Sequence, residues 1–444
     1  MGVITLKQAA AWCGGTVRPE FENVAFLGAG IDTRKLQQGQ LFVALEGVRD
    51  GHEFIDTAFA NGAAAVLCKR CAPHLPAIVV DDPRTALGKI AAGERRRIGM
   101  KVVGVTGSVG KSTTKEMIAC VLAGSYRVSK TPANFNNDLG LPMAILSMPE
   151  TTQVAVLEMG MNHFREIAYL SKIAQPDVGV IINVGVMHIE YLGSREGILQ
   201  AKLEILEGML PQAPLLLNGD NDLLGSCDAG REVTYFGTQS NCAVRATDVQ
   251  EKDGTICYTA CWKDGQFPVT LPLEGMHYVS DSLAAVSVGL CMGVAPVQIA
   301  QRLAAFQTME GRQEIFEQKG FTVIKDCYNA GPESMAAALC VLGKRTGRRI
   351  AVLGDMLELG ECAPAEHRKV GAIAAQNADY VLAYGPNSVF VAEGVKGDCP
   401  VFDDHGAMAR ALKQLARPGD TLLFKGSHGM HMELVLEAFM KLDT

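Results

Sequence analysis

The alternation of hydrophobic and polar positions divides the chain into three α/β regions. In the first region, apolar runs at 41–45, 63–68 and 77–82 predict short strands, and residues 52–63 have the apolar spacing of a helix. Residues 84–99 predict a connecting helix, because an apolar stripe runs along them and three arginines stand near their end, where a helix dipole favours positive charge. We therefore expect a small N-terminal α/β domain over residues 1–84.

The second region alternates strands with helices from residue 101 onward. Its runs at 101–107, 153–159 and 178–185 are almost wholly apolar, which is typical of parallel strands covered on both faces. Residues 111–124 and 274–293 predict helices. Between them, residues 255–262 and 266–273 alternate apolar and polar positions and predict an antiparallel excursion. We assign residues 85–310 to this central domain.

The third region has four more strand-like runs, each ending in polar residues or glycine, with helical segments between them: 321–329, 348–356, 378–385 and 420–427. This order predicts a second doubly wound, Rossmann-like domain over residues 311–444. Ligands of such folds bind beyond the carboxyl ends of the strands. The fold class expected for the whole chain is thus α/β, in three domains.

Composition narrows the class of protein. The 444 residues are 48% hydrophobic and 20% charged, which supports large cores, and a net charge of −7 disfavours broad nucleic-acid binding. Thirteen cysteines without framework spacing, together with a start that has no secretory pattern, predict reduced thiols and a cytoplasmic location. No apolar run reaches the roughly 18 residues that a membrane span needs, so we expect no span.

The stretch GVTGSVGKSTT, residues 104–114, has the context of a phosphate-binding loop. An apolar strand leads into a glycine-rich turn with Gly107 and Gly110, and a helix follows Lys111 directly. Backbone amides, the lysine charge and the helix dipole can then act together on phosphate oxygens, while Ser112 can offer its hydroxyl to Mg²⁺. The common pattern places its first glycine five residues before the second, where this chain has Val105. A plain strand–turn–helix connection is the alternative, and the GKST context disfavours it.

Mg²⁺ bound to a nucleotide needs an acidic group opposite the loop, usually at the end of a neighbouring strand. Glu158 ends the apolar run at 153–159, and His188 follows the run at 178–185. From spacing alone, His188 is as well explained as an ordinary loop histidine. Lys202 and Glu204 fall on a helix, and periodicity alone assigns them to a solvated face.

Other possible metal-binding pairs carry less weight. Cys68 and Cys71 have no second pair nearby with zinc-like spacing. His428 and His431 are explained equally well by a loop before a helix. Hydrolase motifs are absent from the sequence.

Taken together, several stretches resemble the Mur ligases of bacterial cell-wall synthesis along nearly the whole chain. The motifs that carry this resemblance stand in order: IDTRKLQQGQLFVALEGVRDGHEFI, TGSVGKSTTKEM, NFNNDLGLP, LEMGMNHFREI, NVGVMHIEYLGS, AKLEI, DCYNAGPESMAAAL, LGDMLELG and KGSHGMHME. This family uses the shorter spacing G-x-x-G-K-[ST], so Val105 fits its loop. The resemblance implies an N-terminal UDP-binding domain, a central ATP-binding P-loop domain and a C-terminal Rossmann-like domain.

The resemblance also implies roles for individual residues. Those expected to bind ATP are Gly107, Ser108, Val109, Gly110, Lys111, Ser112, Thr113, Asn137, Arg312, Asp326, Asn329 and Asp355. Those expected to hold Mg²⁺ are Ser112, Glu158, His188 and, if carbamylated, Lys202. Those expected to bind the UDP group are Thr33, Arg34, Gly47, Asp50 and His52. Lys111, Glu158, His188 and Lys202 form the implied catalytic set. The family more often has arginine where this chain has His428, and a histidine there would offer fewer donors and no permanent charge.

The implied activity is an ATP-dependent amide ligase that adds D-Ala-D-Ala to UDP-MurNAc-tripeptide through an acyl phosphate, in peptidoglycan precursor synthesis. ATP and Mg²⁺ are the implied cofactors, and we expect a monomer that binds no nucleic acid. Three alternatives stay open: another amino-acid ligase of this family or a folylpolyglutamate synthase-like ligase, a nucleotide-binding P-loop protein without ligase activity, and an inactive paralogue. The sequence does not distinguish diaminopimelate from lysine as the third peptide residue.

Overall fold

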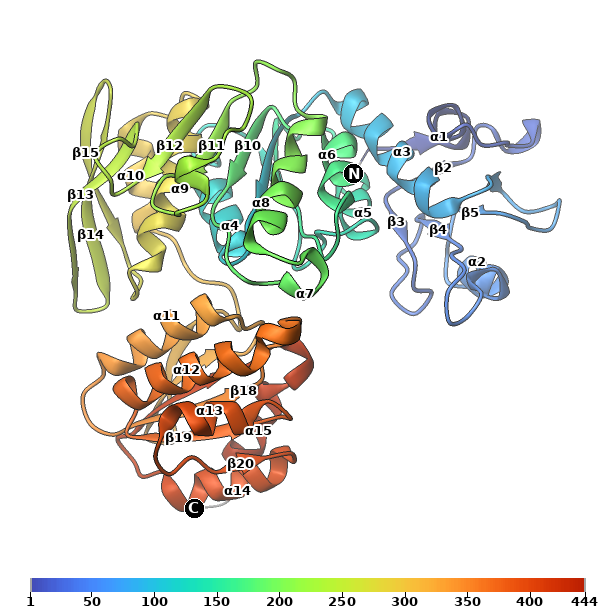
Figure 1. Ribbon diagram of the computed structural model, residues 1–444. Coiled ribbons are helices and arrows are strands. Elements are labelled where there is room, and N and C mark those ends of the chain that lie inside the picture. The colour runs from blue at the N-terminus through green and yellow to red at the C-terminus, as the bar shows by residue number, and fades with distance from the viewer. Residues whose placement is uncertain (1, 443–444) are drawn as a thin grey trace.

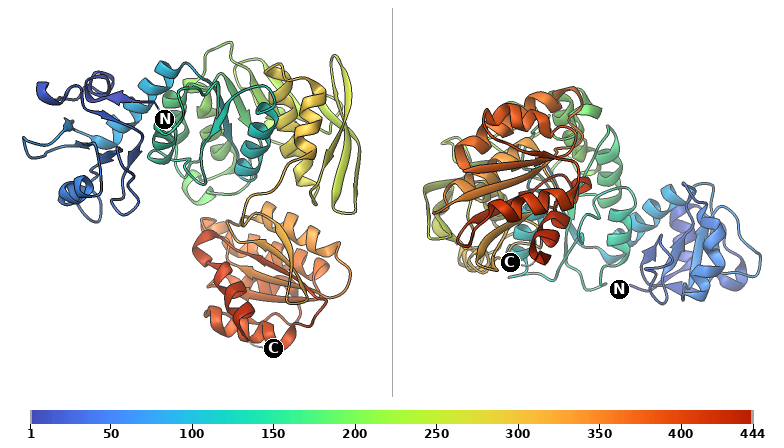
Figure 2. Two further views of the ribbon diagram at one scale, coloured as in Figure 1. Left: turned by 180° about the vertical axis from the view of Figure 1, so that it is seen from behind. Right: turned by 90° about the horizontal axis from the view of Figure 1, so that it is seen from below.

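Three α/β units follow one another along the chain in the computed structural model, which describes residues 2–442. In Figure 1 the central unit lies between the N-terminal unit and the C-terminal unit. In all three views of Figures 1 and 2 the N-terminal unit stands apart from the C-terminal one. The predicted α/β class with three domains is confirmed, while the predicted boundaries at 84/85 and 310/311 stay predictions.

The N-terminal unit contains a parallel sheet of four strands in the order β3-β4-β5-β6 and an antiparallel pair β1-β2. Its elements are β1 (Ile4–Thr5), α1 (Leu6–Cys13), η1 (Pro19–Phe21), β2 (Ala25–Phe26), β3 (Ala29–Gly30), β4 (Leu41–Val43), η2 (Gly51–Phe54), α2 (Ile55–Ala60), β5 (Ala65–Cys68) and β6 (Ala77–Val79). The three predicted strands and the predicted helical segment are all present.

Helix α3 (Pro83–Ile98) joins this unit to the central one. The Asp82 carboxylate accepts a hydrogen bond from the Arg84 amide at its start, and Gly99 ends it in the left-handed conformation. The helix packs against α1 on one side and against α5 and α6 of the central unit on the other. A single apolar cluster therefore runs from Ile4 through α3 into the central sheet.

The central unit is built on a nine-stranded sheet in the order β15-β14-β13-β12-β11-β10-β7-β9-β8. Its strands are β7 (Lys101–Thr106), β8 (Val128–Lys130), β9 (Val154–Glu158), β10 (Val178–Ile181), β11 (Leu215–Asn218), β12 (Val233–Gly237), β13 (Val244–Lys252), β14 (Thr255–Trp262) and β15 (Gly265–Leu271). Its helices are α4 (Lys111–Leu122), α5 (Gly140–Leu146), α6 (Glu166–Ala174), α7 (Ile189–Leu192), α8 (Arg195–Leu203), η3 (Glu204–Gly208), η4 (Leu224–Ser226), α9 (His277–Cys291) and α10 (Pro296–Ala304).

Parallel pairing extends from β8 to β13, and β14 and β15 add the predicted antiparallel excursion. Strand β7 lies between β9 and β10, and later strands are added on both of its sides. Strands β8 and β9 lie on one side, and β10 to β15 lie on the other. Such a switch point opens a crevice at the carboxyl ends of the strands, and the phosphate-loop motif begins there.

The C-terminal unit has a six-stranded sheet in the order β16-β17-β21-β18-β19-β20, parallel except for the β16-β17 hairpin. Its elements are β16 (Glu314–Gln318), β17 (Phe321–Asp326), α11 (Pro332–Gly343), β18 (Arg349–Gly354), η5 (Gly360–Cys362), α12 (Ala363–Asn377), β19 (Tyr380–Tyr384), α13 (Ser388–Val395), β20 (Val401–Phe402), α14 (His405–Leu415), β21 (Thr421–Lys425), η6 (His428–Met430) and α15 (Met432–Lys441). The four predicted strands are present, with β16 and β20 added at the edges.

The contact between the central and C-terminal units is mostly polar. The C-terminal unit buries its own apolar clusters on the two faces of its sheet, and Val186 is the central-unit residue that packs at the margin of one of them. Ion pairs link Lys344 to Glu251, with 2.6 Å between Nζ and Oε2, and Arg345 to Glu274. The C-terminal unit therefore docks on the central one without sharing its core.

Among residues 2–442, no helix combines the length and the apolar character that a bilayer crossing requires. All thirteen cysteines are free thiols.

Candidate active site

A cavity of about 700 Å³ opens where the carboxyl ends of the central strands face the C-terminal unit. Residues from both units line it, including the loop after β7, the ends of β9 and β10, and the segment after β17. This is the crevice expected at the switch point of the central sheet.

The loop after β7 has the backbone that a phosphate-binding loop requires. Gly110 has φ 81°, a left-handed conformation that favours glycine, and helix α4 begins at the next residue. At Gly107, a Cβ atom would lie 2.2 Å from Ile182 Cγ1, so the loop can pass over β10 only with glycine there. The Lys111 ammonium donates to the carbonyl oxygens of Gly107 (2.8 Å) and Ser108 (3.1 Å) and thus lies over the loop.

Asn183, which the sequence analysis did not select, fixes the loop from the end of β10. Its Oδ1 accepts hydrogen bonds from the amides of Ser108 and Val109, both at 2.9 Å, and its Nδ2 donates to the Val109 carbonyl at 2.8 Å. A polar residue directly after an apolar strand was the available signal for it.

Ser112 joins three parts of the cavity. Its hydroxyl donates to Glu158 Oε2 at the end of β9 (2.8 Å) and accepts from Arg312 Nη2 (2.9 Å), which lies between the central and C-terminal sheets. Asn136 Nδ2 donates to the other oxygen, Glu158 Oε1, at 2.8 Å, and the Lys115 ammonium lies 4.0 Å from Oε2. The structure therefore brings the predicted Ser112, Glu158 and Arg312 together and adds two unpredicted partners.

His188 lies on the same cavity, in the loop after β10, with φ 66°. Its Nδ1 is 2.6 Å from Oε2 of Glu358, a residue of the C-terminal unit. Contact with His188 is the main reason why the pKa of the Glu358 carboxyl is lowered. The sequence motif LGDMLELG contains Glu358, but the resemblance implied a role only for Asp355 within it.

The C-terminal wall of the cavity carries further charge. The Arg312 guanidinium stacks over the ring of Tyr328, with 3.9 Å from its central carbon to the ring centroid. The buried Lys425 ammonium pairs with Asp326 (2.6 Å) and donates to the Asn329 carbonyl (3.0 Å). Asp326 and Lys425 meet because they end the neighbouring parallel strands β17 and β21 in register.

Asp281, also unpredicted, projects from α9 to the start of α4. Its Oδ1 accepts a hydrogen bond from the Thr114 hydroxyl at 2.9 Å and lies beside Gly110. Burial raises the pKa of Asp281 to about 7, against the lowering influence of Thr114 and Arg312.

The remaining predicted ATP and metal residues divide into two groups. Ser108, Val109, Thr113 and Asn137 line the cavity, as do Asn329 and His428. Asp355 does not: it is buried, and its Oδ2 accepts hydrogen bonds from the backbone and side chain of Asn387.

Lys202 is buried on α8 and is not among the residues that line the cavity. Within residues 2–442, no carboxylate lies within ion-pair distance of its ammonium group. Burial, and then the nearby Lys111 charge, lower the pKa of Lys202 well below its ordinary value, which favours the neutral amine.

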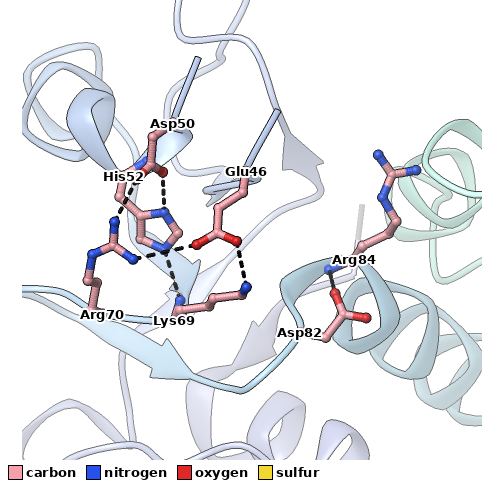
Figure 3. A network of polar contacts seen from close by, with 7 residues as sticks. All are labelled: Glu46, Asp50, His52, Lys69, Arg70, Asp82 and Arg84. Atoms are coloured by element: carbon pink, nitrogen blue, oxygen red, sulfur yellow. Dashed lines mark hydrogen bonds and ion pairs between the residues drawn. The ribbon is translucent and has the colours of Figure 1, made fainter. Parts of the chain in front are cut away.

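The residues expected to bind UDP lie outside the cavity, in the N-terminal unit. Figure 3 shows the polar network around two of them. Asp50 accepts from His52 and from Arg70, and His52 Nε2 accepts from the Lys69 amide at 3.0 Å. Thr33 and Arg34 lie between β3 and β4, and Gly47 lies on the exposed loop after β4.

Glu46, Asp50 and His52 place their ligand atoms close enough to resemble a cation site. The two carboxylates already form ion pairs with cationic side chains of the chain itself. Lys69 Nζ is 2.6 Å from Glu46 Oε2, and Arg70 Nη2 is 2.6 Å from Asp50 Oδ2. The cluster is therefore internally paired.

Comparison with known proteins gives consistent results over the whole chain. Family models described as "Mur ligase family, catalytic domain", "Mur ligase middle domain" and "Mur ligase, glutamate ligase domain" match residues 26–95, 105–289 and 311–428. A UDP-N-acetylmuramoyl-tripeptide–D-alanyl-D-alanine ligase of Bacillus subtilis is 40% identical, over 98% of this chain and 97% of the relative.

Two solved structures have the same arrangement. A crystal structure of MurF from Acinetobacter baumannii superposes with a TM-score of 0.92 at 31% identity and covers 100% of both chains. MurF from Thermotoga maritima in complex with ADP has a TM-score of 0.84 at 32% identity, over 94% of this chain and 97% of that one.

Proposed function

This chain belongs to the Mur ligase family, and on that premise we propose that it is an ATP-dependent ligase that joins D-Ala-D-Ala to UDP-MurNAc-tripeptide in peptidoglycan precursor synthesis. The family expected from the motifs is confirmed. The curated relatives are matched over nearly their full length, and their printed names state this activity.

One observation carries the proposal: the Ser112 hydroxyl is bonded at once to Glu158 of the central sheet and to Arg312 between the two domains. A phosphoryl group held by the loop amides would lie beside all three. Lys111 and Arg312 would offset the negative charge that builds up when two anions approach, and the loop amides add fixed dipoles.

The reaction that this arrangement supports has two steps. In the first, the terminal carboxylate of the tripeptide attacks the γ-phosphorus of ATP, the bond to the bridging oxygen of ADP breaks, and an acyl phosphate forms. In the second, the amine of D-Ala-D-Ala attacks the acyl carbon, loses a proton, and inorganic phosphate leaves as the amide forms. No covalent bond to the protein is required, because phosphate already activates the carbonyl.

The residues present fit a divalent cation. A hydroxyl and a carboxylate oxygen, from Ser112 and Glu158, lie 2.8 Å apart at the cavity, and His188 lines the same space. Oxygen-rich sites of this kind suit Mg²⁺, which would neutralise phosphate charge when bound. We assign Ser112, Glu158 and His188 to this role.

Lys202 is proposed to carry a carbamate. A buried lysine without an anionic partner is costly as a cation, and its neutral amine is the form that combines with CO₂. The amine nitrogen would bond to the carbon of CO₂ and release one proton to solvent. The resulting anion would be able to bind Mg²⁺ and would be attracted by the charge of the nearby Lys111.

The uridine end of the substrate is assigned to Thr33, Arg34, Gly47, Asp50 and His52. Arg34 supports this assignment because its side chain is 85% exposed and only its Nε and Nη2 donate to Asp32, which leaves Nη1 to face a phosphate. We further propose a monomer that works in the cytoplasm, in line with its thirteen free thiols.

The deciding experiment measures phosphate release from ATP with UDP-MurNAc-tripeptide, with and without D-Ala-D-Ala. We expect release and amide product only when the dipeptide is present. Equal release with single amino acids, or with a folate and glutamate, would favour another ligase of the superfamily. Nucleotide binding without any amide product would favour a switch protein or an inactive paralogue.

Replacing Lys202 with alanine should abolish turnover, and small carboxylates such as acetate should restore part of it by supplying the missing anion. The measurement is the rate of amide formation with and without acetate. Lys172→Ala, a change of an exposed lysine of the same domain, is the matched control and should leave the rate unchanged. Unchanged turnover in Lys202→Ala would remove this residue from the site.

A further inference from the structure

The C-terminal domain holds the loop that carries His188, although this loop belongs to the central domain. The Val186 side chain packs against the apolar cluster of the C-terminal domain, and its amide donates to Glu333 Oε1 at 3.2 Å. Farther along the chain, η5 lies against α7, and a Cβ atom on Gly360 would be 3.1 Å from Glu190 Cβ. The position of the loop therefore depends on both domains.

The contact between His188 and Glu358 lies at the centre of this interface. Nδ1 of the ring is 2.6 Å from Oε2 of the carboxylate, and the two side chains are 14% and 34% exposed. Both residues have a left-handed backbone conformation, with φ 66° and 62°, which residues other than glycine rarely adopt. Such conformations persist where the surrounding structure imposes them, so both partners are held in place from their own domains.

This contact orients the imidazole ring. Because Nδ1 faces Glu358, Nε2 is the nitrogen left for a ligand in the cavity that His188 lines. The two atoms lie at ion-pair distance without the alignment of a hydrogen bond, so the carboxylate acts on Nδ1 through its charge. This charge attracts the proton to Nδ1 and makes Nε2 a better donor to a metal ion.

We propose that Glu358 is a positioning residue for His188 and that it couples binding of a divalent cation in the central domain to docking of the C-terminal domain. The proposal rests on the metal role assigned to His188 in the proposed function. The coupling is reciprocal, since a docked domain that strengthens cation binding must itself be held more firmly once the cation is bound.

The opposite arrangement makes the opposite prediction. If the cation took Nδ1 of His188, Glu358 would compete with it for that nitrogen. Removal of the carboxylate would then tighten cation binding, whereas under our proposal it weakens binding. The direction of the change decides between the two.

The test uses the full-length chain saturated with ADP, with Mn²⁺ as the probe and electron paramagnetic resonance to count the free ion. We expect Glu358→Ala to bind Mn²⁺ about 10–100-fold more weakly than the parent, the range typical for loss of an outer partner of a metal-binding histidine. Glu361→Ala, an exposed glutamate three residues along the same segment, is the matched control and should match the parent. Equal or tighter binding by Glu358→Ala overturns the proposal.

Two further readouts separate positioning from a general structural role. The ¹⁵N chemical shifts of the His188 ring should show a proton on Nδ1 in the parent and a mixture of tautomers in Glu358→Ala. Small-angle scattering should show that Mn²⁺ reduces the radius of gyration of the parent but not of the variant. The coupling would be contradicted if Glu358→Ala kept the ¹⁵N ring shifts of the parent and if Mn²⁺ reduced its radius of gyration as it does that of the parent.

Glu358→Gln, which keeps the volume and removes the charge, replaces Glu358→Ala if the latter does not give a cooperative melting curve, and it should also weaken Mn²⁺ binding. Failure here is distinguishable from failure of the proposed function. Amide formation by the parent tests the function, whereas the Mn²⁺ affinities of the variants test the positioning role.

Discussion

Asp281 is a buried acid beside the phosphate-binding loop, and its titration makes stability depend on pH. Its pKa is about 7 in the folded protein against an ordinary value of 3.8, so the folded state keeps a proton that the unfolded state loses between these values. The stabilisation is complete below about pH 3.8 and declines as the pH rises to about 7. Each pKa unit corresponds to about 1.4 kcal/mol, so the loss is on the order of a few kcal/mol.

Replacing Asp281 with asparagine should therefore raise the melting temperature at pH 8, because the variant buries no charge. The advantage over the parent should shrink as the pH falls from 8 to 5, and scanning calorimetry at several pH values measures it. Asp264→Asn changes an exposed aspartate of the β14–β15 turn and should shift the melting temperature little at any pH. An advantage that does not vary with pH would contradict the assignment.

Asn183 supports the phosphate loop with three hydrogen bonds, so Asn183→Ala should loosen the loop without removing a contact to the transferred phosphate. Leaving such groups unpaired costs about 1–3 kcal/mol, which corresponds to an ATP affinity about 5–150-fold weaker. Isothermal titration with a non-hydrolysable ATP analogue measures it. Asn241→Ala, at an exposed position of the same domain, should bind as the parent does.

Predictability of the site follows from how each residue is placed. Glu158 was readable because it ends an apolar strand, and strand ends in a parallel sheet converge. His188 follows another such strand, but its spacing alone did not separate it from an ordinary loop histidine, and only the resemblance implied its role. Asp281 comes from the interior of a long helix, and only the packing of α9 on α4 brings it to the loop. Glu358 reaches His188 from another domain, and no local pattern encodes a docking orientation.

At the scale of elements, the strands with long apolar or alternating runs were readable, whereas short edge strands such as β8 and β16 were not. Strands such as β7 and β9 are continuous apolar runs, because both faces of the sheet are covered. Strand β8 has no buried residue, and β16 (EIFEQ) is mostly polar and pairs on one side through a hairpin. Such short edges owe their conformation to the neighbouring strand, so their own sequences give little signal.

Helix α3 is the element that joins two domains, and Gly93 marks its tightest contact. A Cβ atom there would lie 2.2 Å from Trp12 Cδ2, within the indole ring of α1. Gly93→Val should therefore lower the free energy of unfolding by about 1–3 kcal/mol through overpacking. Urea denaturation followed by tryptophan fluorescence measures it, and Arg96→Val, which places the same residue at an exposed position of α3, should cost much less.

At the scale of the whole molecule, we expect the C-terminal domain to be the mobile part, because its contact with the central domain is mostly polar and a single segment connects the two. Arg312 lies on the segment 305–313 between α10 and β16, so a rotation of this domain carries the guanidinium toward or away from Ser112. Closure over the bound substrates would exclude water, which otherwise hydrolyses an acyl phosphate.

We predict that the unliganded protein samples an open arrangement and becomes more compact with ligands. Small-angle scattering should show a smaller radius of gyration after addition of an ATP analogue and UDP-MurNAc-tripeptide together. The exposed pairs between the two domains, such as Lys344 with Glu251, are screened by salt, so the unliganded form should expand further as ionic strength rises. An unchanged radius under both conditions would contradict a mobile domain.

The apolar cluster shared by the N-terminal and central domains has a different consequence. Because α3 packs against both, we expect these two domains to move as one body, which would fix the distance from the proposed uridine site to the phosphate loop. A substrate anchored by its uridine end then reaches the phosphate loop only if its peptide has the matching length. A precursor whose peptide is one residue shorter would bind yet leave its carboxylate short of Ser112, so the enzyme would reject it by length rather than by the identity of its side chains.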